Sequence, residues 1–396
     1  MDKKDFREQI KYDKDNNAEG VIEEVALKFG YSQELKDLLL KIYNRVYSNS
    51  SYEVQQNFLQ TLNEVPIVVV DKMTPELYGE LQDEYLGKDR VQIEEEASEY
   101  NSQFAPGAYV TTPVIDKSGN LIGKKSFLYI ERLSSYFDEV IQKLGTDIHV
   151  PHLIHELGHA QAARNNEYTQ QGNIISSRCG MLQSENEVEF RDGKTVIVEK
   201  SSKGIYLEEA INTVLEYENV AKFLGIEPQE VDDELYRGVG IHGLVPSSYH
   251  GLMDSIGQKI QMVLGKSSLE QIRLFDNKKA IEEFNQRGAQ TQYWQERAHS
   301  EEEMKKKKEI LEAPESTSWK EFCQKNYDTY FGIHDGETPI QRIDNVLRQV
   351  YDMKMVKYNI PLEEYNKIIL NILGEAYYVL NQMEAERESN LEKQKE

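Results

Sequence analysis

Three residues in the segment His152–Ala162, "HLIHELGHAQA", have the types and the spacing of a metal site. His155 and His159 are four positions apart, and Glu156 follows the first of them. Residues four apart lie on the same face of an α-helix, so both imidazoles can bind one zinc ion. Glu156 lies about 100° round the helix, where a carboxylate can serve as general base toward a metal-bound water.

The surroundings of this motif predict a buried helix. Two histidines and a glutamate are costly to bury unless they are paired or bind a metal, so a metal site is favoured over ordinary core histidines. His149 and His152 precede the motif and are expected to support the ligands from outside or to lie at the surface. The apolar residues of the segment are Leu153, Ile154, Leu157, Ala160 and Ala162.

The segment "LIHELGHAQA" resembles the active-site helix of the zincin metallopeptidases. The longer metzincin pattern, H-E-x-x-H-x-x-G-x-x-H, is not met, because Ala162 replaces its glycine and Asn165 its third histidine. Another zincin group, the gluzincins, takes the third ligand from a glutamate followed by Ala or Gly at the start of a second helix. "GIYLEEAINTVLEYE" contains Glu209-Ala210 in that context. The resemblance therefore implies Glu209 as the third ligand.

The same resemblance implies an activity. The implied activity is that of a zinc-dependent peptidase with one zinc ion per chain. In such a peptidase Glu156 would activate the zinc-bound water that attacks a peptide carbonyl. The substrate would be a peptide or a protein. The resemblance extends over Lys125–Gly265, is carried by the two short motifs, and includes lethal-factor-like bacterial members. In those proteins a polar loop and a hairpin lead into the ligand helix, and "SSRCGMLQ" is expected to be such a loop.

Two other residues are alternatives for the third ligand. Glu208 is one register step from Glu209. Cys179 is the second alternative, because the peptide deformylases pair H-E-x-x-H with a cysteine, although there the cysteine precedes the histidines in an E-G-C-L-S context. Glu209 also has a simpler interpretation, as a solvated first-turn glutamate favoured by the helix dipole.

The supporting shell of the predicted site departs from the family. Thermolysin-like members have an aspartate one helical turn after the ligand glutamate, which orients the first zinc histidine; here that position is Thr213. Either Thr213 takes this role or Glu216 does, a surface position being the alternative for Glu216. The departure allows a second hypothesis, a non-catalytic zincin-fold binding protein with a structural or absent metal. The intact Glu156 argues against it.

A zinc peptidase also needs a donor for the oxyanion that develops in the transition state. Tyr249 and His250 begin a predicted helix and are candidates for this role. The alternative is that Tyr249 belongs to the core, because it precedes Leu252 and Ile256 at helical spacing.

Hydrophobic patterns before the motif predict helices and then strands. "SQELKDLLLKIYNRVYS", with Ser32 as a cap, and "SYEVQQNFLQTLNE" are predicted helices. The β-branched run Val65–Asp71 predicts a buried strand, and two or three strands are expected on either side of a turn at Ser118–Asn120.

After the motif, "NEVEFRDGKTVIVEK" predicts a hairpin with its turn at Asp192-Gly193, followed by a helix that ends near Gly225. The expected fold class is therefore α+β, and the resemblance implies that it is zincin-like. A mixed sheet with the active-site helix is followed by a mainly helical C-terminal half.

The expected domain organisation has three parts. Residues 1–20 form a polar tail, and residues 21–265 form the zincin-like domain, with a sheet-bearing part over 21–165 and a ligand-helix part over 166–265. Residues 266–396 form a helical C-terminal region with a charged tail. These C-terminal helices are a candidate surface for a protein partner.

Charge and composition exclude some functions. The chain of 396 residues has 46 Lys and Arg against 69 Asp and Glu, a formal net charge of −23. Nucleic acid is therefore not an expected partner. No apolar stretch reaches membrane-spanning length, and the charged first residues favour the expectation of a chain without a signal peptide. Two cysteines do not make a disulfide framework. A cytoplasmic location is expected, with leaderless export as the alternative.

Overall fold

The chain is described by a computed structural model. The description covers residues 18–87, 105–164, 168–191, 194–231, 235, 247–265, 277–291 and 338–355, with single positions and short runs within 305–321 and 378–393. The described parts confirm the predicted α+β class, with many helices and two small sheets.

Three helices open the described chain: α1 (Ala18–Phe29), α2 (Gln33–Ile42) and α3 (Tyr52–Glu64). The predicted cap of α2 is confirmed, because the Leu35 N–H donates to the Ser32 hydroxyl oxygen at 3.2 Å. Helix α1 begins inside the predicted 1–20 tail, whose first 17 residues lie outside the description. The predicted apolar face of α2 and of the turn after it is buried at Leu35, Leu38, Leu39, Ile42 and Val46.

The first sheet has three strands in the order β1-β3-β2. Strands β1 (Ile67–Val70) and β3 (Leu121–Glu131) are parallel. Strand β2 (Gly107–Ile115) is joined to β3 by the predicted turn, in which the Asp116 carboxylate accepts the N–H groups of Ser118 and Asn120 at 2.8 and 2.9 Å. The sheet is therefore mixed, as predicted, and β2 is an edge strand.

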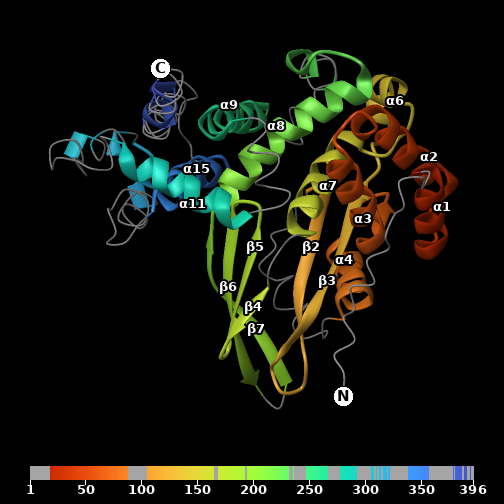
Figure 1. The fold of residues 1–396 in the computed structure, drawn as a ribbon, viewed down its shortest axis with the longest axis horizontal. Coiled ribbons are helices and arrows are strands. Elements are labelled where there is room, and N and C mark those ends of the chain that lie inside the picture. Colours follow the sequence, from red (N-terminus) through yellow and green to blue (C-terminus); the bar gives the residue numbers. More distant parts are fainter. Residues whose placement is uncertain are drawn as a thin grey trace. The chain divides into compact units, whose positions relative to one another are not determined.

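The motif residues lie on helix α7 (Val150–Arg164), beside strands β2 and β3 (Figure 1). Before α7 come helix α4 (Pro75–Leu81) and helix α6 (Asp138–Leu144). Aromatic and aliphatic side chains from the first sheet and α4 form one core cluster, with Val70, Met73, Tyr78, Leu81, Leu86, Phe127 and Tyr129 buried.

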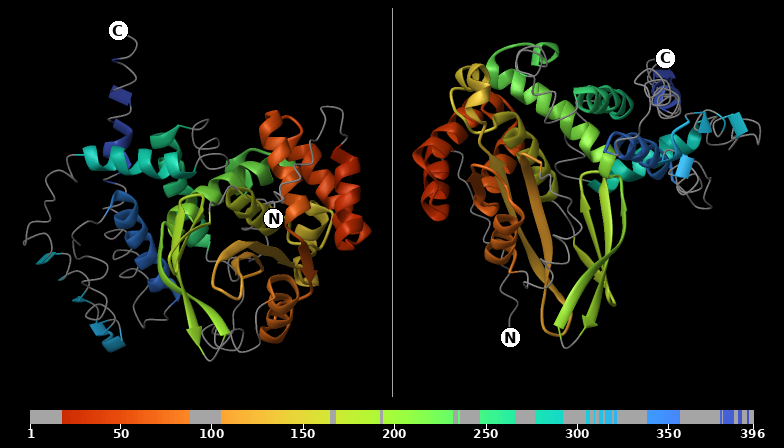
Figure 2. Two further views of the ribbon diagram at one scale, coloured as in Figure 1. Left: turned by 60° about the horizontal axis from the view of Figure 1, so that its bottom comes forward. Right: turned by 180° about the vertical axis from the view of Figure 1, so that it is seen from behind.

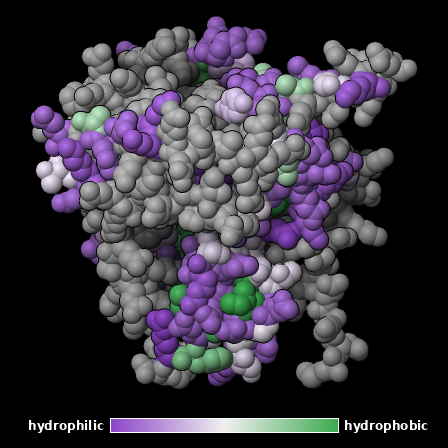
Figure 3. Space-filling model, turned by 90° about the vertical axis from the view of Figure 1, so that its left-hand side faces the viewer, coloured by the Kyte–Doolittle hydropathy of each residue, from purple (hydrophilic) through white to green (hydrophobic). Residues whose placement is uncertain are grey.

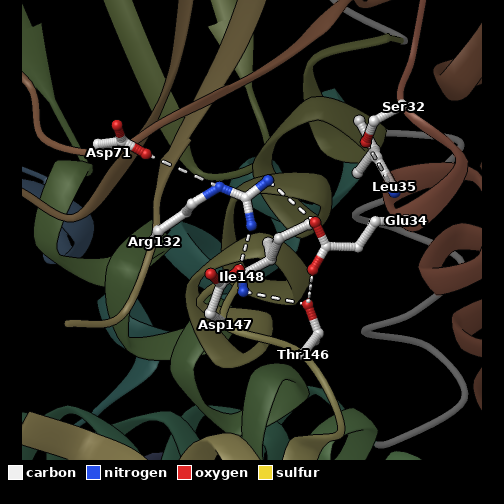
Figure 4. Close-up of polar contacts among 8 residues, drawn as sticks. All are labelled: Ser32, Glu34, Leu35, Asp71, Arg132, Thr146, Asp147 and Ile148. Atoms are coloured by element: carbon white, nitrogen blue, oxygen red, sulfur yellow. Dashed lines mark hydrogen bonds and ion pairs between the residues drawn. The ribbon is translucent and has the colours of Figure 1, made fainter. Parts of the chain in front are cut away.

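An ion-pair network at the end of β3 fixes the chain that leads into α7 (Figure 4). The guanidinium of Arg132 contacts the carboxylates of Asp147 and Glu34, the latter at 2.9 Å, and lies 3.9 Å from that of Asp71. The Thr146 hydroxyl donates to Glu34 at 2.7 Å. The hydrogen bond from Arg132 lowers the pKa of Glu34 below its usual range. The network joins α2, β3 and the segment before α7.

The second sheet has four antiparallel strands in the order β4-β5-β6-β7 (Figure 2). They are β4 (Thr169–Gln171), β5 (Ile174–Cys179), β6 (Leu182–Arg191) and β7 (Lys194–Lys203). The predicted β6–β7 hairpin is confirmed, although its turn residues Asp192 and Gly193 lie outside the description. The predicted loop "SSRCGMLQ" is wrong, because it forms the end of β5, a tight turn and the start of β6.

The later helices include α8 (Ile205–Leu224), which ends just before Gly225 as predicted, and α9 (Ser247–Leu264). Helices α11 (Asn277–Gln290) and α15 (Pro339–Met355) belong to the predicted C-terminal helical region. The amphipathic segment "LEEYNKIILNILGEAYYVLNQM" lies largely outside the described residues.

Two compact units divide the described chain. The first is drawn from Met1–Thr112, Lys124–Gln161 and Tyr217–Val239, and the second from Pro113–Gly123, Ala162–Glu216 and Gly240–Glu396.

On the face in Figure 3, hydrophilic residues cover most of the coloured surface and hydrophobic ones form small groups. Within the described residues, no helix has the length and apolar character needed to span a membrane.

Candidate metal centre

Helix α7 brings the motif into a buried position. The side chain of His149 accepts the His152 N–H at 3.4 Å and its carbonyl accepts the Leu153 N–H at 3.0 Å, which together make His149 a cap for the helix. Pro151 lies in the first turn, where a missing N–H costs nothing. The predicted apolar positions are all buried: Leu153, Ile154, Leu157, Ala160 and Ala162.

His155 and His159 direct ring nitrogens at the same point. Their Nε2 atoms lie 3.1 Å apart, and the rings are nearly perpendicular, at 79° with centroids 4.8 Å apart. His155 is buried, and His159 is half-buried. Two nitrogens at this separation either share a proton or bind one cation through both lone pairs.

Glu209, on the first turns of α8, completes a three-residue group with these histidines. One ligand atom from each of His155, His159 and Glu209 lies within 4.8 Å of the other two. The described residues contain no other group of three or more His, Cys, Asp or Glu side chains with such spacing. The arrangement is the one implied by the sequence resemblance, and neither Glu208 nor Cys179 is part of it.

Glu208 is used elsewhere. Its side chain is buried, and its Oε2 accepts the Met181 N–H at 2.8 Å. The carboxylate packs so closely on Gly180, a residue with a φ of +57°, that a Cβ there would collide with it. Glu208 therefore stabilises the turn between β5 and β6, next to the buried Cys179.

The two residues considered for the supporting shell are both buried. The Thr213 hydroxyl donates to the backbone carbonyl of Glu209 at 2.8 Å, within its own helix. Glu216 is only 2% exposed, so the surface alternative for it is wrong. Helix α9 packs against this part of α8 through Gly257, where a Cβ would collide with the Ala210 carbonyl.

Glu156 is oriented by the edge strand β2. Its Oε2 accepts the backbone N–H of Tyr109 at 2.7 Å. The close approach of β2 depends on Gly107, where a Cβ would collide with the Ile130 side chain and lie 3.4 Å from the Glu156 Cγ. The residue is only 8% exposed, and the hydrogen bond from Tyr109 gives its carboxylate a defined orientation.

His149 and His152 form a second histidine pair on α7. Their Nδ1 atoms lie 3.0 Å apart, and both residues are buried, so the surface alternative for them is wrong. The Nδ1 of His149 also accepts the backbone N–H of His152, an arrangement that favours the Nδ1 of His152 as the donor between the two rings. The pair stabilises the start of the helix that carries the motif.

The sequence identifies some residues of the site and not others. Tyr249 and His250 begin α9, but their side chains lie outside the described residues, as does Asn165. The sequence does not predict the roles of Tyr109 and Gly107, because a backbone N–H donor and a close strand approach have no residue-type signature. A glycine just inside a predicted strand was the one available signal.

Comparison of the chain with protein-family models, curated proteins and solved structures gives no match. The case for a function therefore rests on the residues of the site and their geometry.

Proposed function

We propose that the chain is a zinc-dependent peptidase of the gluzincin type, with His155, His159 and Glu209 as the metal ligands. The observation that carries this proposal is the convergence of one donor atom from each of these three side chains, all within 4.8 Å of one another. The donors come from two helices, as the resemblance of the two short motifs implies. The substrate class is a peptide or protein.

The donor types are those of zinc sites, and the two histidines have the spacing that one zinc ion requires. Zinc binds imidazole nitrogen at about 2.0–2.1 Å in a tetrahedral arrangement, which places neighbouring ligand atoms about 3.3 Å apart. The Nε2 atoms of His155 and His159 are 3.1 Å apart. Two histidines and one carboxylate leave a fourth position open, as in catalytic zinc sites. When bound, zinc polarises a carbonyl as a Lewis acid and lowers the pKa of water.

Glu156 supplies the acid–base chemistry in this proposal. Its carboxylate lies one residue from His155 on the same buried helix, and the Tyr109 N–H orients one of its oxygens. A carboxylate in this position takes a proton from the attacking water and passes it to the leaving amine. The Tyr109 bond holds the carboxylate in one orientation. Less side-chain entropy is therefore lost when the carboxylate is positioned for proton transfer.

The second candidate function is a non-catalytic binding protein with the same metal ligands. The observation that favours it is the Thr213 hydroxyl, which donates to the Glu209 carbonyl and stands where a thermolysin-like protein has an orienting aspartate. The buried Glu156 argues for the enzyme, because a structural metal needs no carboxylate beside its ligands.

Hydrolysis of a peptide mixture by the full chain and by Glu156→Gln tests the choice. We expect the variant to keep its zinc and to lose at least about 100-fold in rate, the usual contribution of a general base. Equal rates for the two proteins would contradict the enzymatic role of Glu156. Zinc binding without hydrolysis in the parent protein would favour the binding-protein alternative.

A further inference from the structure

The N-terminus of helix α8 has no capping side chain of its own. The residue before the helix is Gly204, which has a φ of +79°, and a Cβ there would collide with the Met181 carbonyl. A glycine at this position satisfies the sterics of the strand-to-helix turn, but it leaves the first N–H groups of α8 without a local acceptor. Glu209 lies only four residues after the first helical residue, Ile205.

Asp344, on α15, supplies the missing acceptor. Its Oδ2 accepts the Gly204 N–H at 2.9 Å, and its Oδ1 accepts the N–H groups of Tyr206 and Leu207 at 2.7 and 3.4 Å. One buried carboxylate therefore binds three backbone donors at the positive end of α8. The four residues belong to the same compact unit, although Asp344 lies 138 positions after Tyr206.

The first turn of α8 is also fixed from a second direction. Glu208 binds the Met181 N–H at 2.8 Å, so its side chain points to the β5–β6 turn. Glu209, the next residue, lies about 100° further round the helix and offers its carboxylate to the metal group. Rotation or fraying of this turn would move Glu209 away from His155 and His159.

The burial of Asp344 is consistent with a functional role for its carboxylate. The residue is only 6% exposed, and burial raises the pKa of its carboxyl to about 6, although the three N–H groups and the charge of Arg348 lower it. A buried carboxylate of this kind carries a cost that an apolar residue at the same place would avoid.

We propose that Asp344 is a positioning residue of the metal centre, which fixes the first turn of α8 and thereby places the carboxylate of Glu209. This inference rests on the proposed metal function and makes α15, within the C-terminal helical region, a necessary part of the site. The C-terminal helices, a candidate surface for a protein partner, would then also support the metal ligands.

Zinc titration of the full chain against a chromophoric chelator at pH 7.5 tests this role. We expect Asp344→Ala to weaken zinc binding about 10- to 100-fold, the range known for groups that orient metal ligands. Asp344→Asn keeps one oxygen acceptor and loses the other, so we expect a loss of about tenfold. Val346→Ala is the control, because it removes buried packing from α15 and leaves the Asp344 carboxylate in place.

The outcomes separate this inference from the function on which it rests. Zinc binding by Val346→Ala should equal that of the parent. This result would show that a weakened α15 alone does not lower the zinc affinity. Parent-like affinity in Asp344→Asn overturns the inference, and this variant decides if Asp344→Ala does not fold. If Glu209→Ala binds zinc as the parent does, or the parent binds none, the proposed ligand set fails and the inference falls with it.

Discussion

The backbone N–H of Tyr109 donates a hydrogen bond of 2.7 Å to Oε2 of Glu156. This bond joins the edge strand of the first sheet to the helix that carries the histidine pair. It orients the one carboxylate that the proposed chemistry requires to move a proton. The strand approaches so closely because residue 107 has no side chain.

Gly107→Ala tests the dependence of Glu156 on this strand. A Cβ at position 107 would collide with Ile130 and lie 3.2 Å from the Tyr129 carbonyl oxygen, so we expect β2 to move outward and the Tyr109–Glu156 bond to weaken. Overpacking of this kind costs about 1–3 kcal/mol in the free energy of unfolding. Peptide hydrolysis should fall while zinc content is unchanged.

The control for this change is Gly123→Ala on β3, where a Cβ would have no heavy atom within 4 Å. It should leave both the melting temperature and the hydrolysis rate close to those of the parent. Full hydrolysis by Gly107→Ala would show that the strand does not orient Glu156.

Gly180→Ala tests the assignment of Glu208 to the β5–β6 turn. The left-handed φ of +57° costs an alanine about 1–2 kcal/mol. Displacing the Glu208 carboxylate from the Met181 N–H adds about 1–3 kcal/mol. Gly30→Ala has a similar φ of +70° and open space around its Cβ, so it measures the backbone cost alone.

In thermal unfolding, the melting temperature of Gly180→Ala should therefore be well below that of Gly30→Ala. The folded Gly180→Ala protein should still bind zinc, because Glu208 is not a ligand in the proposed set. Its affinity should be lower than that of the parent, because the Glu208–Met181 bond also fixes the first turn of α8. Complete loss of zinc with the fold retained would move the third ligand from Glu209 to Glu208.

Asp344 predicts a specific dependence of stability on pH. Burial raises the pKa of its carboxyl from 3.8 to about 6, so the folded chain holds this proton more tightly than the unfolded chain. This group therefore stabilises the fold most below pH 3.8, and the contribution is lost as pH rises to about 6. The total change is about 3 kcal/mol.

Asp344→Asn lacks this titration. Its melting temperature relative to the parent should rise between pH 4 and pH 7. The difference between Val346→Ala and the parent should stay constant over the same range. A constant difference for Asp344→Asn would contradict the raised pKa. A carboxylate that costs stability at neutral pH is consistent with a role in function, here the proposed positioning of Glu209.

Much of the site could be predicted from local patterns. The i, i+4 spacing of His155 and His159 and the apolar residues around them are properties of one helix, and these features are confirmed in α7. The proximity of Glu209 to the two histidines could be expected, because the resemblance specified its neighbour and its place at the start of a helix.

The contacts that orient these residues could not be predicted in the same way. Tyr109 acts through its backbone, which every residue type offers, and Asp344 is brought to α8 from a distant segment by the tertiary fold. The "SSRCGMLQ" segment reads as a polar loop because its strands are half-exposed and carry serine and glutamine on both faces. Pairing with neighbouring strands, and not local propensity, makes it a sheet.

The zinc content of the purified full chain, measured beside Glu209→Ala and Glu208→Ala, tests the central claim most directly. The proposed ligand set predicts one zinc ion per chain in the parent and in Glu208→Ala, and its loss in Glu209→Ala. Zinc retained by a folded Glu209→Ala protein, or absent from the parent after reconstitution, would contradict the assignment of His155, His159 and Glu209 as a metal centre.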